Sequence, residues 1–286
     1  MKTLPLGDVA FLPDPRGWKK MLSHPRCEEF LKAEDAEVRK LTQMGARKVV
    51  KGGRRGVPVT EHILRSSFVF ATKRFADSGE IEKFKAGLVA DGSGQRDVDE
   101  THAPTIGGTS LRIIFAVVAQ RGHFISKLDV ESAFLIEDLD RPTYVQLPKE
   151  YTDYLGKPTE VWELIRSLYG LRQAPRLCWL GMQAALQGLG FRSSDHDPCL
   201  FVRKESDGTY TYVATHVDDC AVVSASMETN QEVRDGLLLN KGVKWEDQAE
   251  TFVGLALRRG QNGDLLVHQP VYTRHVCDVR GWRRMG

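Results

Sequence analysis

Three aspartates lie in apolar surroundings, where their carboxylates could hold metal ions. Asp218 and Asp219 are adjacent in the β-branched run YVATHVDDCAVV (212–223), and Asp129 is flanked by leucine and valine. A carboxylate in an apolar strand costs free energy unless it is paired or bound to a metal ion, and adjacent carboxylates repel each other. Neighbouring strand residues point to opposite faces, so the adjacent pair can converge on one site most readily at a tight hairpin turn.

Each aspartate also has an ordinary structural explanation. Asp is a common turn former, so Asp218 and Asp219 are compatible with a plain surface turn, and Asp129 with a strand end that caps a neighbouring turn. Three carboxylates from two strands are also the oxygen ligands that two hard divalent cations require for phosphoryl transfer. The residues alone leave both interpretations open.

The composition is that of a folded globular protein. A chain of 286 residues with 41% apolar and 27% charged residues can bury a sizeable core, as one large domain or a domain with subdomains. The five cysteines include no C-x-x-C pair, which argues against a disulfide framework and a zinc knuckle. Without a signal-peptide pattern or an 18-residue apolar run, we expect an intracellular protein, cytoplasmic or nuclear, with no membrane partner.

The charge is nearly balanced overall but uneven along the chain. Forty basic and 38 acidic residues give a net charge of +2, which neither demands nor excludes a polyanionic partner. The stretch from Arg39 to Arg55 holds seven basic residues and no acidic one. Such a stretch is either solvated surface or a site of phosphate contact.

Residue patterns predict an α+β protein with helices packed on one face of an antiparallel sheet. The predicted helices are amphipathic ones that stop at Gly45, a buried one capped by Thr109 or Ser110, a long one from Pro175 to Gly188 or Gly190, and one beginning near Met227. The predicted hairpins turn at Asp77-Ser78-Gly79, at Asp207-Gly208 and at Asn262-Gly263.

Several motifs, in order, resemble those of reverse transcriptases from copia-like LTR retrotransposons. They are LDVESAFL (128–135), LYGLRQAPRLCW (168–179) and HVDD (216–219), against family patterns L-D-V-x-x-A-F-L, L-Y-G-L-K-Q-A-P-R-x-W and Y-V-D-D. The stretches at 101–122 and 252–259 extend the similarity, which is nearly continuous from about Phe68 to Tyr272.

The resemblance implies the right-hand polymerase fold, with fingers and a palm whose antiparallel sheet is backed by helices, and a thumb that is partial or absent. The implied domains are 1–60 as N-terminal extension and start of the fingers, 61–125 as fingers, 126–255 as palm with part of the fingers inserted, and 256–286 as the end of the palm hairpin and a truncated thumb start.

The implied activity is RNA-directed DNA synthesis. A primer 3′-hydroxyl attacks the α-phosphate of a deoxynucleoside triphosphate (dNTP) with the help of two Mg²⁺ ions, or Mn²⁺ in their place. The implied partners are an RNA or DNA template, a nucleic-acid primer and dNTP, and the protein would be particle-associated within a complete element.

The same resemblance assigns roles at the reacting end of the site. Asp129 and Asp218 match the essential pair of metal-binding catalytic carboxylates, Asp219 is the third, and the backbone carbonyl of Val130 is an additional ligand.

Four further positions would bind the nucleotide. Phe134 matches the aromatic gate that excludes a 2′-hydroxyl, although a plain core aromatic would fit the pattern as well, and Gln173 matches a residue of the nucleotide pocket. Lys73 and Lys85 lie in the predicted hairpin whose basic residues grip the triphosphate.

The chain departs from the family in that hairpin. The family pattern K-A-R-L-V-A-K-G reads KAGLVADG here, so Gly87 replaces an arginine and Asp91 replaces a lysine. Lys73, Lys83 and Lys85 would substitute only in part, which leaves open a catalytically impaired relic that keeps the fold and at most binds nucleic acid. A carboxylate metallonuclease would fit the three aspartates but not LYGLRQAP.

Overall fold

The computed structural model describes residues 13–74, 80–96, 100–130, 135, 137–238, 243–269, 272–273 and 276–277. The chain divides into two compact units, which we describe separately. Unit 1 comprises Met1–His102 and Phe134–Leu177, and unit 2 comprises Ala103–Ala133 and Cys178–Gly286. Among the described residues, no helix combines the length and the apolar character that a bilayer span needs.

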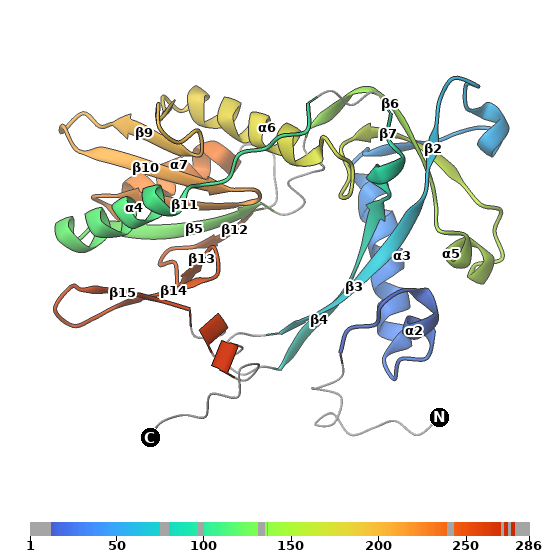
Figure 1. The fold of residues 1–286 in the computed structure, drawn as a ribbon, viewed down its shortest axis with the longest axis horizontal. Coiled ribbons are helices and arrows are strands. Elements are labelled where there is room, and N and C mark those ends of the chain that lie inside the picture. Colours follow the sequence, from blue (N-terminus) through green and yellow to red (C-terminus); the bar gives the residue numbers. More distant parts are fainter. Residues whose placement is uncertain are drawn as a thin grey trace. The chain divides into compact units, whose positions relative to one another are not determined.

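Unit 1 contains a four-stranded sheet in the order β1-β7-β6-β2 and a separate two-stranded hairpin, β3-β4 (Figure 1). Its strands are β1 (Arg47–Val49), β2 (Ile63–Leu64), β3 (Ser66–Arg74), β4 (Ile81–Ala90), β6 (Asp138–Gln146) and β7 (Val161–Arg166). Its helices are α2 (Trp18–Leu22), α3 (Cys27–Gln43), α5 (Lys149–Tyr154) and the 3₁₀ turns η1 (Gly53–Gly56) and η2 (Gly92–Gly94).

Helix α3 packs against one face of the β3-β4 hairpin through aromatic contacts. Phe30 is fully buried, and its ring meets Phe70 and Phe84 edge to face at centroid distances of 5.4 and 5.0 Å. Strand side chains alternate between faces, so these contacts leave the opposite face of the hairpin to Val69, Lys73, Lys83 and Lys85, all exposed. The amphipathic α3 thus fixes which face of the hairpin meets solvent.

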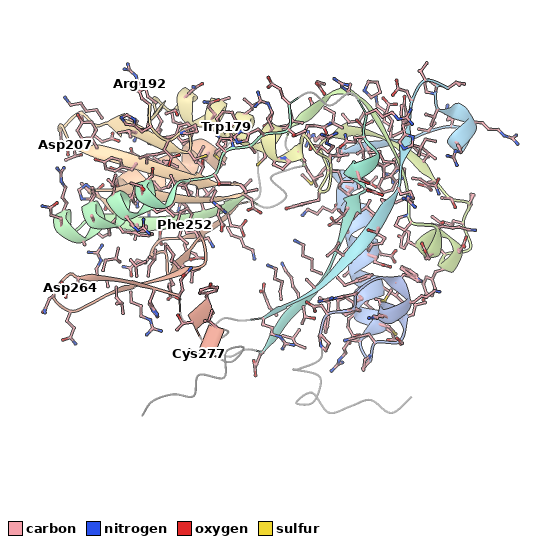
Figure 2. The ribbon with its side chains drawn as sticks, viewed as in Figure 1. Trp179, Arg192, Asp207, Phe252, Asp264 and Cys277 are labelled. Atoms are coloured by element: carbon pink, nitrogen blue, oxygen red, sulfur yellow. The ribbon has the colours of Figure 1, made fainter. Side chains whose placement is uncertain are left out.

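Unit 2 is built on a six-stranded antiparallel sheet in the order β12-β5-β11-β10-β9-β8. Its strands are β5 (Phe124–Val130), β8 (Arg192–Ser193), β9 (Leu200–Lys204), β10 (Tyr210–His216), β11 (Asp219–Ser224) and β12 (Val243–Glu246). A three-stranded sheet follows, of β13 (Thr251–Phe252), β14 (Leu255–Arg259) and β15 (Leu265–His268). Figure 2 shows Asp207 and Asp264 at the turns of β9-β10 and β14-β15.

Helices cover both faces of the six-stranded sheet. Helix α7 (Met227–Leu238) is anchored by buried Asn230, whose amide donates to Ser126 Oγ at 2.8 Å and to the Val222 carbonyl at 3.3 Å. On the opposite face, α4 (Gly108–Arg121) shares an apolar core with Ile125 and Val223. Asp129 and Asp219 lie on the α4 face as well. They are an even number of residues from Ile125 and Val223, and side chains along a strand alternate between the two faces.

Most predicted elements are confirmed, including the three hairpin pairs and helix α6 (Ala174–Gly188), but four expectations are wrong. The helices lie on both faces of the six-stranded sheet, because α4 and α7 each bury an apolar side, and not on one face as predicted. Gly107 is the N-cap of α4, and Ser110 instead donates to Asp197 at 2.5 Å. Helix α4 is not buried all round, because Ile113 is 56% exposed. Strands β2 and β6 pair in parallel, so the sheets are not wholly antiparallel. The predicted turn at Asp77-Ser78-Gly79 lies outside the described residues.

Candidate active site

Asp129 and Asp219 lie directly opposite each other on β5 and β11. Residues so paired share one face of the sheet, with their Cβ atoms about 5 Å apart. Asp218 is the second residue of the two-residue turn between β10 and β11, and its carbonyl accepts a hydrogen bond from Val130 N at 3.1 Å. The prediction of a tight turn is confirmed, and the turn is tied to the strand end that carries Asp129.

The turn has a strained backbone. Val217 adopts φ +59°, in the left-handed region that β-branched residues rarely occupy. Its carbonyl accepts a weak hydrogen bond from Cys178 Sγ at 3.6 Å. Backbone strain of this kind costs about 1–3 kcal/mol and persists only where the surroundings enforce it. The strained geometry is what sets Asp218 at the turn next to the Asp129–Asp219 pair.

Two lysines flank the paired carboxylates on the same face. Lys127, two residues before Asp129, places its Nζ 3.5 Å from Asp219 Oδ1, and both side chains are largely buried. Lys244 on β12 lies opposite Asp129 and is exposed. Like charges in opposite strand positions destabilise a sheet, so these ammonium groups offset part of the repulsion between Asp129 and Asp219.

The electrostatic surroundings of Asp219 favour a positive charge close to its carboxylate. Burial raises the pKa of its carboxyl; Lys127 opposes that shift, and the carboxylates of Asp129 and Asp218 add to it. A buried carboxylate beside two others is stabilised in its charged form when positive charge is brought close.

The donor chemistry fits the divalent ions that the resemblance implies, since Mg²⁺ and Mn²⁺ prefer carboxylate and carbonyl oxygens. Across the described part of the chain, however, no three His, Cys, Asp or Glu side chains are gathered closely enough to form a ligand set. Asp129 and Asp219 are paired, and the Lys127 ammonium lies beside Asp219 where a cation would be expected. Metal binding here would therefore require Lys127 to withdraw.

A Lys127→Gln variant tests this competition. We expect its affinity for Mn²⁺ to rise about five- to tenfold, because a partly buried ammonium no longer neutralises Asp219. Isothermal titration calorimetry with Mn²⁺ measures the effect. Lys244→Gln is the matched control on the same row, and its exposed charge should change the affinity less than twofold. Equal affinities of wild type and Lys127→Gln would contradict the competition.

In unit 1, the predicted nucleotide-binding lysines lie on one face of the β3-β4 hairpin. Lys73 is opposite Lys83, and Lys85 is the next residue along β4 on that face. Among the described residues, none of the three lysines forms a salt bridge, and the Glu37 carboxylate on α3 interacts electrostatically with Lys85 alone of the three. This face is suited to an oligophosphate.

The two departures in this hairpin have different consequences. A Cβ built on Gly87 meets nothing within 4 Å, so the missing arginine leaves open space on the strand. Asp91 accepts hydrogen bonds from the backbone and hydroxyl of Ser93, and its carboxylate lies 3.6 Å from Arg65. The Ser93 hydroxyl also lowers the pKa of Asp91. Asp91 therefore serves as a local cap rather than as an unpaired charge.

Gln173 lies just before α6 and is only 7% exposed. Its Oε1 accepts a hydrogen bond from Gln95 Nε2 at 2.9 Å. Phe134, the predicted gate, lies outside the described residues. The predicted residues thus fall into two groups, the carboxylates in unit 2 and Gln173 with the lysines in unit 1.

Sequence reasoning missed three contributors to these groups. Lys127 could have been found, since it is two residues from Asp129 and a strand repeats its faces with that period. The contact of Gln95 with Gln173 has no local signal, because it depends on chain segments that meet only in the fold. The positive φ of Val217, in contrast, is what a two-residue hairpin turn needs at its first position, so it follows from the predicted turn.

Comparison with known proteins supports the motif assignment. A model of the family "Reverse transcriptase (RNA-dependent DNA polymerase)" matches residues 56–279. The retrovirus-related Pol polyprotein from transposon TNT 1-94 of Nicotiana tabacum is 28% identical over 269 residues, 93% of this chain and 20% of that protein. The Pol polyprotein from transposon RE2 of Arabidopsis thaliana is 32% identical over 219 residues, 76% of this chain.

A shorter relative is the putative transposon Ty5-1 protein of Saccharomyces cerevisiae, 33% identical over 138 residues, which are 48% of this chain. The chain spans only 20% and 15% of the two plant polyproteins. The family match covers the carboxylate pair, the turn and the β3-β4 hairpin alike, since residues 56–279 include all three. The chain therefore belongs to the reverse transcriptase family of copia-like transposon Pol polyproteins.

Proposed function

We propose that this chain is the RNA-directed DNA polymerase core of a retrotransposon, which extends a nucleic-acid primer on an RNA or DNA template with dNTP. The observation that carries the proposal is the Asp129–Asp219 pair beside the strained turn of Asp218, in a chain of this family. In this proposal the six-stranded sheet is the palm, and the β3-β4 hairpin is part of the fingers.

Each group of residues has a separate task. Asp129, Asp218 and Asp219 would hold two Mg²⁺ ions, which when bound supply activation of the primer hydroxyl and charge stabilisation at the leaving phosphate. The carbonyl of Val130 would add a ligand. Gln173 would donate a hydrogen bond to the nucleotide, and Phe134 would exclude a 2′-hydroxyl.

The lysines of the hairpin would position the triphosphate. Lys73, Lys83 and Lys85 share one exposed face, and their combined charge attracts an oligophosphate without fixing its orientation, because an ammonium is a point charge. Orientation of the triphosphate would therefore depend more heavily on Gln173 here than in relatives that carry the arginine.

The test is primer extension on a poly(rA) template, with the chain and its Asp218→Ala variant compared at equal concentration. Incorporation by the wild type only is the expected result. Equal incorporation by both would contradict the proposal.

Two observations favour a second candidate, an impaired relic that at most binds nucleic acid. The guanidinium is absent at Gly87, and Lys127 competes for Asp219. Under this reading, both the wild type and Asp218→Ala would bind primer–template and neither would extend it.

Gly87→Arg is expected to lower the KM for dTTP about tenfold. A guanidinium makes bidentate, charge-assisted hydrogen bonds to phosphate, and the open space at Gly87 accommodates it without a clash. Steady-state extension on poly(rA) primed with oligo(dT) gives the KM. Gly87→Ala, which also replaces glycine in the strand but adds no charge, should leave KM within about twofold. A KM unaffected by the arginine would contradict the role of the hairpin.

A basic loop in unit 1 offers a contact for template or primer phosphates. We use this name for Lys48, Lys51, Arg54 and Arg55, which are exposed and, among the described residues, have no acidic partner within 4 Å. The loop is tightly folded, because a Cβ on Gly56 would lie 2.0 Å from the Lys51 carbonyl. The tight backbone therefore brings Lys51, Arg54 and Arg55 together on a short turn.

Replacing the four charges of the basic loop with glutamine should flatten the salt dependence of RNA binding. Each lost phosphate contact reduces the slope of log K against log salt by about 0.7 for a single strand. Fluorescence anisotropy with labelled single-stranded RNA at several salt concentrations measures the slope. Glutamine at four other exposed lysines of unit 1, Lys19, Lys20, Lys149 and Lys157, is the control. Equal slopes for the two quadruple variants would exclude the basic loop as the contact.

A further inference from the structure

Two glutamines from distant parts of the sequence meet in unit 1. Gln95 follows η2, and its Nε2 donates to Oε1 of Gln173 at 2.9 Å across 78 residues of sequence. Its own Oε1 accepts a hydrogen bond from the backbone N–H of Arg172 at 2.7 Å. Gln95 therefore makes hydrogen bonds to two adjacent residues, Arg172 and Gln173, in the segment before α6.

The backbone contact determines how both amides are oriented. A backbone N–H can only donate, so the Gln95 oxygen must face Arg172 and its nitrogen must face Gln173. The Gln173 oxygen is then occupied as an acceptor, which leaves the Gln173 nitrogen as its remaining donor. Gln173 makes no other side-chain hydrogen bond with a described residue.

Close backbone packing holds the segment around Gly92 against the segment around Gly170. A Cβ on Gly92 would lie 2.1 Å from the Gly170 carbonyl, and one on Gly170, at φ +90°, would lie 2.0 Å from the Ala90 carbonyl. Ala90 N also donates to the Tyr169 carbonyl at 2.8 Å. Only glycine fits at these two positions, so Gln95 approaches Gln173 on a rigid support.

We propose that Gln95 is a positioning residue, which fixes the Gln173 amide so that its nitrogen donates to an acceptor oxygen of the incoming nucleotide. The inference rests on the proposed function, because it assigns the ligand as a dNTP. The Gln173 side chain is only 7% exposed, so few water molecules can replace a hydrogen bond that a wrongly oriented amide fails to make. The orientation of this amide therefore affects nucleotide binding.

Gln95→Glu reverses the polarity of this contact. A glutamate still accepts the Arg172 N–H, but its second oxygen cannot donate to Gln173 and can only accept from it. The Gln173 amide then turns, and its oxygen replaces its nitrogen toward the substrate. We expect the KM for dTTP to rise about tenfold, with a smaller change in kcat.

A double-mutant cycle separates positioning from a general structural effect. Once Gln173→Ala has removed the amide, Gln95→Glu should raise KM less than twofold further, whereas an equal tenfold rise in both backgrounds would overturn the proposal. Gln95→Met, which keeps the length without either hydrogen bond, should give an intermediate KM, and serves if the glutamate variant does not fold.

A second readout requires no activity. In ¹⁵N NMR spectra of the free protein, the side-chain NH₂ signals of Gln173 should shift in Gln95→Glu, because that nitrogen now donates to a carboxylate. Unchanged Gln173 signals would overturn the positioning role even if extension is robust. Shifted signals in a chain that extends no primer would uphold the orientation by Gln95 and contradict the proposed function instead.

Discussion

Asp218→Ala is expected to lose primer extension by about 1000-fold, the loss of about 4 kcal/mol of transition-state stabilisation. Asp218 lies at the turn next to the Asp129–Asp219 pair, and within the described residues its carboxylate has no hydrogen-bond or salt-bridge partner to lose. Its removal also relieves repulsion on Asp219, so thermal stability should be equal to the wild type or slightly higher. Extension assays and thermal melts on one preparation measure both effects.

Asp195→Ala is the control for this substitution, because Asp195 is an exposed aspartate in the same unit, away from the β10-β11 turn. It should extend primers like the wild type. A variant at Asp218 that melts normally and still extends at more than about a tenth of the wild-type rate would show that the turn carboxylate is dispensable.

The second large effect is expected from Glu34 on α3. Its side chain is fully buried, and neither carboxylate oxygen has a hydrogen-bond partner among the described residues. Burial raises the pKa of Glu34 to about 8, and the neighbouring Asp35 carboxylate contributes in the same direction. Asp35 itself accepts a hydrogen bond from the Tyr151 hydroxyl at 2.8 Å.

The free energy of unfolding of the Glu34→Gln variant is expected to lack the decrease with rising pH that Glu34 causes in the wild type. In the unfolded chain Glu34 ionises near 4.5, whereas in the folded chain it stays protonated up to about 8. The unfolded state therefore binds fewer protons across this window, and the free energy of unfolding falls as pH rises from 4.5 to 8. The variant lacks this decrease. The difference in the free energy of unfolding between Glu34→Gln and the wild type should therefore grow by about 3–5 kcal/mol between pH 4.5 and 8.5, in favour of the variant.

Urea denaturation at several pH values, followed by tryptophan fluorescence, measures this difference; Trp18 and Trp162 lie in the same unit as Glu34. Glu28→Gln on the exposed side of the same helix is the control and should run parallel to the wild type. A constant difference between Glu34→Gln and wild type across this range would mean that Glu34 ionises in the folded chain.

Local signals were strong enough to predict the elements that carry the site. Apolar alternation with Asp-Gly and Asn-Gly turns predicted two hairpins of unit 2, and Pro175 marked the first turn of α6. The cap of α4 was predicted wrongly because Asp197, about 90 residues away, binds both Ser110 and the Gly107 N–H. The residues that form a turn are consecutive in the sequence, whereas the N-terminus of α4 is capped by a residue from a distant part of the chain.

The sequence by itself determined the family, the three aspartates and the tight turn at Val217-Asp218, because each is encoded within a few consecutive residues. Only the tertiary structure decided that Asp129 lies opposite Asp219, that the Lys127 ammonium lies 3.5 Å from that carboxylate, and that the Gln95 amide donates to Gln173. Strand register and amide polarity depend on which segments meet across dozens of residues, and no pattern within one segment encodes its partner.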